Sequence, residues 1–155
     1  MTRQKIKTCL WFDGNSEEAA RFYVSVFKSR GDSAITGVTR DPCGAALVVA
    51  FRLAGVEFLA LNGSAPPRLD AAISLSVDCQ SQEGLDDLRK TLSAGGSRGR
   101  GGWLKDRYGL SWQIVPAVLP QLLGAGRGRA PGVMDALMGV TRHDIRALET
   151  AAGAA

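Results

Sequence analysis

The chain has 155 residues, of which 45% are hydrophobic and 22% are charged, a balance typical of a globular protein. No apolar run approaches the roughly 18 residues that span a bilayer. Asp13 ends the apolar run Cys9–Phe12 far too early for a signal peptide. The three cysteines include no Cys-x-x-Cys pair, which argues against a disulfide framework and a zinc knuckle. We therefore expect a cytoplasmic protein with reduced thiols and no membrane partner.

The net charge of +4 has its excess in loop residues, namely Arg98, Arg100, Lys105, Arg107, Arg127 and Arg129. Basic surfaces attract anions or nucleic acid. No stacking aromatic residues alternate with these arginines, as they do in proteins that bind single strands. We therefore expect solvated loops and no nucleic-acid partner, and the sequence leaves open whether these loops bind an anion.

The first part of the chain predicts a strand followed by an amphipathic helix. Residues alternate over Ile6–Phe12, as in a half-buried strand. Asn15 and Glu18 have the spacing of a capping box at the start of a helix. The apolar positions that follow have helical spacing and form one stripe, Ala19, Phe22, Tyr23, Val26 and Phe27. Gly31 ends this helix.

Turn signals then bound three strands, which we expect at Ala34–Thr39, Ala45–Leu53 and Val56–Leu61. The segment Asn62–Pro67 has the composition of a linker. The element order up to this point is therefore β-α-β-β-β.

The same pattern restarts after the linker. Asp13 and Asp78 are 65 positions apart, and the same offset aligns Glu18 with Glu83. A second first strand follows at Ala72–Asp78, and a second helical stripe consists of Leu85, Leu88 and Leu92. This alignment of elements favours an internal duplication.

A predicted hairpin closes the second half. Trp103 and Leu104 enter a polar turn in which Gly109 supplies the positive φ and Asp106 pins the backbone. On the exit strand Leu110, Trp112 and Ile114 share one face, and Ser111, Gln113 and Val115 share the other. A strand with one apolar and one mixed polar face is typical of the wall of a concave site.

The last part of the chain predicts short helices around Val118–Leu123, Val133–Met138 and Ile145–Ala151, with Asp144 capping the last one. We divide the chain into a first module at residues 1–65, a second module at 66–116 and a helical extension at 117–155. Together they are expected to form one structural domain.

Three segments, Cys9–Asn15, Phe58–Gly63 and Gly102–Gln113, resemble motifs of the vicinal oxygen chelate superfamily, which includes glyoxalase I and bleomycin-resistance proteins. The likeness is to its PhnB-like branch, also labelled demethylubiquinone methyltransferase-like. The resemblance implies an α+β fold of two tandem βαβββ modules, whose curled mixed sheets surround a cleft, with a short helical tail. It also implies a homodimer. Gly101 stands where that branch usually has a cysteine.

Metal enzymes of that superfamily bind their metal through first-strand histidines and last-strand glutamates. Those first-strand positions correspond here to Lys7 and Ala72, the second last-strand position to Gln113, and Glu57 is the carboxylate of the other last strand. A transition-metal site needs three or four converging donors. We therefore expect neither a metal nor another cofactor.

The candidate ligand-binding residues are Gln113, Trp11, Ser111, Cys9, Lys7 and Trp103. Gln113 can both donate and accept hydrogen bonds toward a ligand, or it can bond a neighbouring strand. The tryptophans can form an aromatic wall or belong to the core, and core is favoured for Trp112. Lys7 can meet an anion or face water.

The resemblance implies a protein that binds an unidentified small molecule in a cleft between the modules. The alternatives are a metal-dependent lyase, isomerase or dioxygenase, and a drug-binding resistance protein. The glycine-rich run Gly124–Gly128 follows a helix-like segment, so the strand-to-helix turn of a nucleotide-type methyltransferase is absent. Catalytic residues remain unassigned, and whether the protein is an enzyme stays open.

Overall fold

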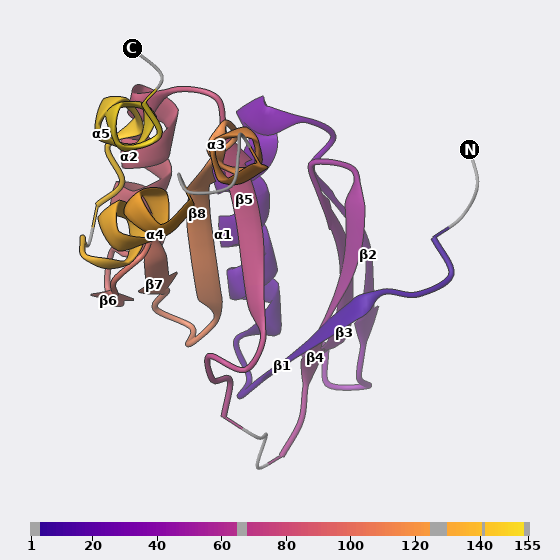
Figure 1. Ribbon diagram of the computed structural model, residues 1–155. Coiled ribbons are helices and arrows are strands. Elements are labelled where there is room, and N and C mark those ends of the chain that lie inside the picture. The colour runs from indigo at the N-terminus through magenta and orange to yellow at the C-terminus, as the bar shows by residue number, and fades with distance from the viewer. Residues whose placement is uncertain (1–3, 65–67, 125–129, 141, 154–155) are drawn as a thin grey trace. The chain divides into compact units, whose positions relative to one another are not determined.

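The computed structural model describes residues 4–64, 68–124, 130–140 and 142–153 (Figure 1). Arg127 and Arg129, two of the predicted basic loop residues, lie outside the described residues. By its internal contacts the chain divides into two units, Met1–Arg68 and Leu69–Ala155. Each unit contains one four-stranded mixed sheet, with strand orders β1-β4-β3-β2 and β5-β8-β7-β6.

The first unit is a complete βαβββ module. Its elements are β1 (Thr8–Phe12), α1 (Ser16–Phe27), the 3-10 turn η1 (Lys28–Arg30), β2 (Ala34–Arg40), β3 (Ala46–Leu53) and β4 (Val56–Asn62). β1 runs parallel to β4, and β2, β3 and β4 are antiparallel neighbours. The predicted strands and helix are confirmed, with ends that differ by a residue or two.

One face of this first sheet is buried against α1. Ala19, Tyr23 and Phe27 are buried on the helix, and the ring of Tyr23 lies 6.3 Å from that of Phe51 on β3. On β4 the buried residues Phe58 and Ala60 alternate with half-buried ones, as the two-residue period of a strand requires. The opposite face of the sheet, turned away from α1, is therefore the more open one.

The predicted capping box at the start of α1 is wrong. Asn15 occupies the cap position, but its side chain makes no capping hydrogen bond. The backbone N–H of Ser16 instead donates to Oδ1 of Asn62, at 2.9 Å. The side-chain amide of Asn62, at the end of β4, thus accepts from one of the unpaired N–H groups at the start of the helix. Asn62 is too distant in sequence for a local motif to reveal this contact.

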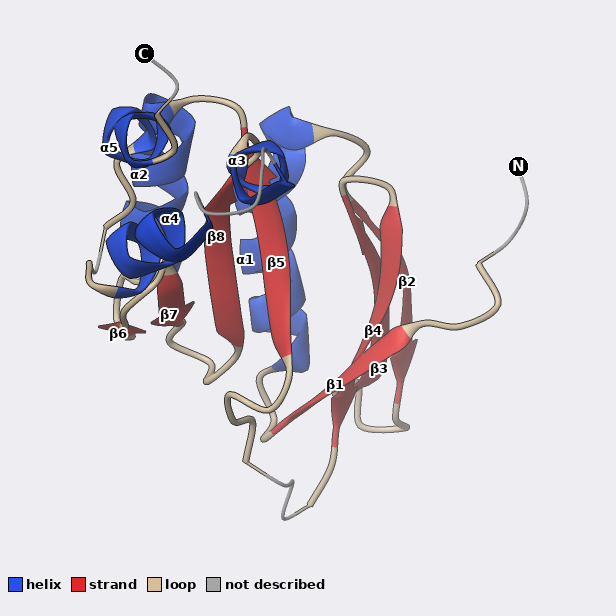
Figure 2. Ribbon diagram, viewed as in Figure 1, coloured by secondary structure: helices blue, strands red, loops and turns tan. Residues whose placement is uncertain are grey.

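The second unit repeats the module with much shorter middle strands and adds three helices (Figure 2). Its elements are β5 (Ser74–Cys79), α2 (Gln82–Leu92), β6 (Ser97–Arg98), β7 (Trp103–Lys105), β8 (Ser111–Pro116), α3 (Leu119–Gly124), α4 (Ala130–Met138) and α5 (Ile145–Ala151). β5 runs parallel to β8, and β6, β7 and β8 are antiparallel neighbours. The order of elements is that of the first unit, as the internal repeat predicts.

The core of the second unit confirms the predicted faces. Leu85, Leu88 and Leu92 of α2 are fully buried, as are Trp112 and Ile114 on β8. The three last helices build a further apolar cluster of their own, from Leu119, Leu122, Val133, Leu137, Leu148 and Ala152. Within the described ranges, no helix is long and apolar enough to cross a membrane.

Candidate ligand-binding surfaces

Gln113 lies on the open face of the second sheet. It is half-buried on β8, directly opposite Trp103 on β7 and Ser76 on β5. Its amide Nε2 donates to the Ser74 hydroxyl at 2.8 Å, so one of its two functions bonds a neighbouring strand. The carbonyl Oε1 accepts no hydrogen bond from the described residues, and it is the atom left to contact a ligand.

Ser111 shares this face but is covered. Its side chain is buried, and its hydroxyl lies 3.4 Å from the carbonyl oxygen of Asp70. Trp103, by contrast, is half-buried beside Gln113. Of the three candidates in this unit, the structure therefore brings Gln113 and Trp103 together at an accessible surface and places Ser111 beneath the segment before β5.

Trp11 lies on the open face of the first sheet. It is 39% exposed, on a strand whose neighbours Leu10 and Phe12 are buried. Its indole lies against Gly63, where a Cβ atom would overlap the ring nitrogen and sit 2.7 Å from two ring carbons. Gly63 thus leaves the space that this exposed indole occupies.

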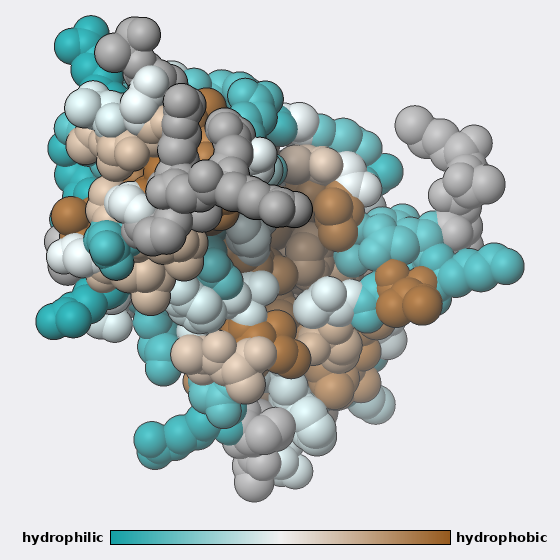
Figure 3. Space-filling model, viewed as in Figure 1, coloured by the Kyte–Doolittle hydropathy of each residue, from teal (hydrophilic) through white to brown (hydrophobic). Residues whose placement is uncertain are grey.

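The surroundings of Trp11 are apolar and accessible. Cys9 precedes it on the same face and is exposed as a free thiol. Across the parallel pairing, Leu59 stands beside Cys9 and Leu61 beside Trp11, both half-buried. Figure 3 shows brown, apolar patches that interrupt the hydrophilic surface. Among the described residues of this unit, the exposed large hydrophobic side chains are Trp11, Ile6, Leu47 and Val56.

Lys7 forms an ion pair with Glu57. Its Nζ lies 2.7 Å from Oε2 of Glu57, and the two side chains are 23% and 27% exposed. Lys7 stands at a position that corresponds to a metal ligand in the resemblance, and Glu57 is the carboxylate of the strand that carries another. An ammonium cannot coordinate a metal, and Gln113 already donates to Ser74. The described residues also contain no group of three or more His, Cys, Asp and Glu side chains that could hold a metal ion. The donor set does not fit the metal that the fold family implies.

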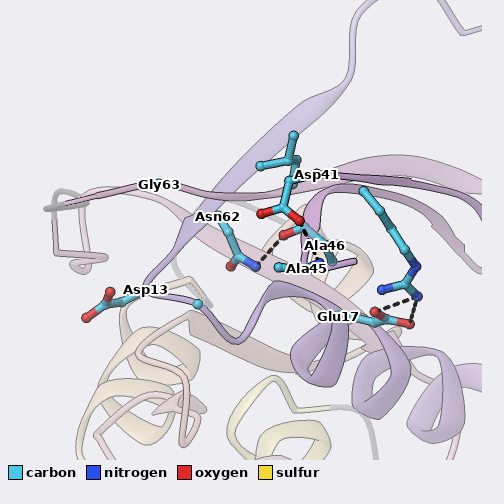
Figure 4. A pocket seen from close by; sticks show the side chains of 10 residues that line it. Asp13, Glu17, Asp41, Ala45, Ala46, Asn62 and Gly63 are labelled. Carbon is cyan, nitrogen blue, oxygen red and sulfur yellow. Dashed lines mark hydrogen bonds and ion pairs between the residues drawn. The ribbon is translucent and has the colours of Figure 1, made fainter. Parts of the chain in front are cut away.

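A hollow of about 520 Å³ opens at the start of α1 (Figure 4). Its lining consists of Asp13, Gly14, Glu17, Arg40, Asp41, Ala45, Ala46, Leu47, Asn62 and Gly63. This volume is within the range of small-molecule pockets. None of these residues belongs to the set predicted from the sequence.

The charged groups of this hollow are largely committed to each other. Glu17 pairs with Arg21 at 2.8 Å and with Arg40 at 3.0 Å, and these hydrogen bonds lower the pKa of its carboxyl below the usual value. Asp41 accepts from the backbone N–H groups of Cys43 and Ala45. Asp13 points away from the other charged groups in Figure 4. The hollow therefore offers space and few free polar groups.

The composition of Asn62–Pro67 predicts a linker, but Asn62 and Gly63 have structural roles that this pattern does not reveal. Asn62 ends β4, and its amide joins the N–H of Ser16 to the carbonyl of Ala46. The N–H of Gly63 continues the pairing with β1 by donating to Phe12 at 3.3 Å. An Asn-Gly pair usually marks a turn. Here both residues pair with β1, so they form the end of a strand instead.

The paired βαβββ modules define a protein of the glyoxalase fold, the fold of the vicinal oxygen chelate superfamily. Residues 4–115 match the family model of 3-demethylubiquinone-9 3-methyltransferase. The chain belongs to this PhnB-like family.

Solved structures agree with this assignment. The PhnB protein from Bacillus cereus is 32% identical, with a TM-score of 0.64, and the match covers 74% of this chain and all 100% of that one. Protein PA1353 from Pseudomonas aeruginosa is 18% identical, with a TM-score of 0.59, over 74% of this chain and 98% of its own. The fosfomycin resistance protein FosX from Listeria monocytogenes, solved with Mn(II) and sulfate, is 16% identical, with a TM-score of 0.57, over 79% and 99%. The last two likenesses show the fold alone. Among curated proteins, none matches the chain.

Proposed function

We propose that this protein binds a small organic molecule against the open faces of its sheets, and does so without the metal site of its superfamily. The observation on which this proposal depends is the exposed indole of Trp11 on β1, which lies against Gly63. An aromatic ring that stays exposed on a sheet does not gain the full free energy of burial, because part of its apolar surface remains in contact with water. A ligand that covers the ring removes this surface from water, and the free energy gained contributes to binding.

Polar groups for orienting a ligand stand on both faces. On the first sheet Cys9 precedes Trp11, and Lys7 is held by Glu57. On the second sheet the free carbonyl of Gln113 stands beside Trp103. Small-molecule sites commonly combine apolar and aromatic walls with a few polar groups of this kind. The proposal concerns binding, and among the described residues it names no nucleophile paired with a base.

Two further properties belong to the proposal. The three cysteines are all free thiols, which supports a reducing, cytoplasmic location. The exposed apolar side chains of the first unit support a homodimer, since large apolar surfaces commonly mark protein interfaces.

A screen by thermal shift tests the proposal. Compounds that raise the melting temperature of the wild type are retested on Gly63→Ala, whose new methyl group must displace the Trp11 indole. The matched control is Gly37→Ala on β2, where an added Cβ meets only the Ala50 side chain at 4.0 Å. We expect Gly63→Ala to lose the stabilisation and Gly37→Ala to keep it. Equal stabilisation of both variants by every active compound would contradict a site at Trp11, and a library without any active compound would count against the proposal for the chemical classes it contains.

A further inference from the structure

Four polar side chains form one stripe along α2, on the side that meets the C-terminal segment. Gln82, Asp86, Arg89 and Ser93 are spaced by four, three and four positions, so they lie on one helix face. Three of the four have a side-chain hydrogen-bond partner outside the helix, and for the fourth, Arg89, the described residues provide none. The positive charge of Arg89 therefore lacks the direct neutralising partner that Asp86 provides for Arg142.

Gln82 ties the C-terminal segment to the start of the stripe. Its Nε2 donates to the carbonyl of His143 at 2.9 Å, and its Oε1 accepts from the N–H of Ile145 at 3.0 Å. Both functions of the amide are thereby used, and the segment Arg142–Ile145 is held alongside α2.

Asp86 is the acidic group of the stripe, and its oxygens are already occupied. Arg142 donates to them through Nε at 2.7 Å and Nη2 at 2.6 Å, the two-pronged geometry that makes such pairs strong. Gln82 also donates to both oxygens at 3.3 Å. These hydrogen bonds lower the pKa of Asp86, and the bonds from Arg142 have the largest effect. The carboxylate has little capacity left for a second guanidinium.

Arg89 is buried without such a partner. Only 4% of the residue is exposed, and its Nη1 makes no hydrogen bond within the described part of the chain. Burial and the repulsion of Arg98 lower its pKa, and Asp86 only partly opposes this. A guanidinium stays charged in proteins, so the unpaired charge is costly to bury.

Two more arginines flank this buried cation. Arg98 donates through Nε to the Ser93 hydroxyl at 3.0 Å, which holds it at the far end of the stripe. Arg142 is held at the near end by Asp86. Both repel Arg89 electrostatically. Two further guanidinium groups thus act on the charge of Arg89, which only the carboxylate of Asp86 opposes, and the exposed Asp144 acts on Arg142.

We propose that Arg89, flanked by Arg98 and Arg142, binds a small oxyanion of the sulfate or phosphate class where α2 meets the segment Arg142–Ile145. Guanidinium forks match the oxygens of such anions in geometry and charge. The site is separate from the open face that carries Gln113, because α2 packs against β5, β7 and β8 on the side that carries the buried Trp112 and Ile114.

His143 offers a reporter inside this site. It is the only histidine of the chain and is 1% exposed, packed where Gly102 has no side chain. Burial and the charge of Arg89 lower its pKa, and the nearby carbonyls of Ile114 and Leu137 oppose this shift, although neither ring nitrogen forms a hydrogen bond within the described ranges. An anion at Arg89 would cancel the repulsion and raise the pKa of His143.

The experiment titrates the full chain with inorganic sulfate, at constant ionic strength maintained with sodium chloride. Sulfate keeps its charge over the pH range in which a histidine titrates. A shift in the titration midpoint of His143 therefore cannot come from titration of the sulfate. We expect a saturable rise in the melting temperature, since a ligand of the native state stabilises by mass action. We also expect the NMR titration midpoint of His143 to move to higher pH.

Arg89→Gln should lose both responses, and Arg100→Gln, an exposed arginine outside the stripe, should keep them. Because a buried variant can fail to fold, two surface variants test the same site. Arg98→Gln should weaken the sulfate response, and Asp86→Asn should shift it to lower sulfate concentration by removing the competing carboxylate.

A rise that does not saturate, or that Arg89→Gln shows as fully as the wild type, would be the general stabilising effect of sulfate and would overturn the site. An unchanged midpoint of His143 at saturating sulfate would overturn it as well, and so would equal responses of Arg98→Gln and Asp86→Asn.

Discussion

The indole Nε1 of Trp112 donates a hydrogen bond to Oδ2 of Asp106 at 2.8 Å, and both residues are buried. The other carboxylate oxygen, Oδ1, accepts from the backbone N–H groups of Tyr108 and Leu110, at 2.8 and 3.1 Å. One side chain therefore closes the turn between β7 and β8 and anchors the largest aromatic residue of the second core. The sequence predicted both roles, Asp106 as the residue that pins the turn and Trp112 as core.

Replacing Asp106 with Ala should destabilise the fold strongly. The change leaves the buried indole N–H and two backbone donors without their acceptor, and we expect a loss of about 2–4 kcal/mol in the free energy of unfolding. Urea denaturation measures this loss. Asp78→Ala, at an exposed position of β5, serves as the control, and an equal loss in both variants would show that Asp106 does not anchor the turn.

Acid should weaken the second unit through His143. Burial and Arg89 hold the pKa of this imidazole below its usual value, so the folded state favours the neutral ring. The resulting stability is complete above the usual pKa of histidine and is lost as the pH falls toward the lowered value. Between about pH 7 and pH 5, the unfolding free energy should fall with a slope of at most about 1.4 kcal/mol per pH unit for this one proton.

Urea denaturation at several pH values checks this dependence, with His143→Gln as the comparison. The variant should have a flatter profile over the same range, because it lacks the titrating ring. Parallel profiles for the wild type and the variant would assign the acid sensitivity to other groups.

Protein purified without a histidine tag should bind well under one equivalent of zinc, nickel, iron or manganese. Lys7 and Glu57 neutralise each other, so the pair leaves no open carboxylate for a cation. A chelator should leave the melting temperature unchanged, because a metal bound to the native state would stabilise it by mass action. A stoichiometric metal together with a chelator-sensitive midpoint would instead favour the metal-dependent lyase, isomerase or dioxygenase.

The main features of the fold could be predicted because they follow from local patterns. The leucine stripe of α2 and the alternating faces of β8 depend only on spacing, and both are confirmed. The cap of α5 is local as well, since Asp144 accepts from the N–H of Ala147 three residues later. The cap of α1 could not be predicted, because its acceptor is Asn62 on another strand.

The candidate site was harder to predict, since its contacts cross between strands. The pairing of Lys7 with Glu57 follows from the parallel register of β1 and β4, in which Thr8 stands beside Phe58. The position of the Trp11 indole likewise depends on Gly63 at the end of the partner strand, where a side chain would overlap the ring. The buried charge of Arg89 had no signal in the sequence, where it is one basic residue in the last turns of a helix.

In solution we predict a homodimer. Exposed strand edges and apolar side chains are features that a partner commonly covers, and Leu47, Val56 and Trp11 are such side chains on the first unit. Light scattering at micromolar concentration should give about twice the 16.4 kDa mass of one chain. A mass near that of a single chain would contradict the prediction.

The central claim, that the open sheet faces bind a small molecule, is tested most directly on the Gln113 and Ser74 pair. Gln113→Leu keeps much of the volume but removes both amide functions, whereas Ser74→Ala removes only the strand bond at 2.8 Å. For a compound that stabilises the wild type, calorimetry should show that Gln113→Leu weakens binding by about 1–3 kcal/mol, the cost of an unpaired polar group, and that Ser74→Ala leaves the affinity nearly unchanged. Equal affinity of the wild type and Gln113→Leu, with equal losses of stability in the two variants, would show that Gln113 is only a contact between strands and would contradict the claim for the open face of the second sheet.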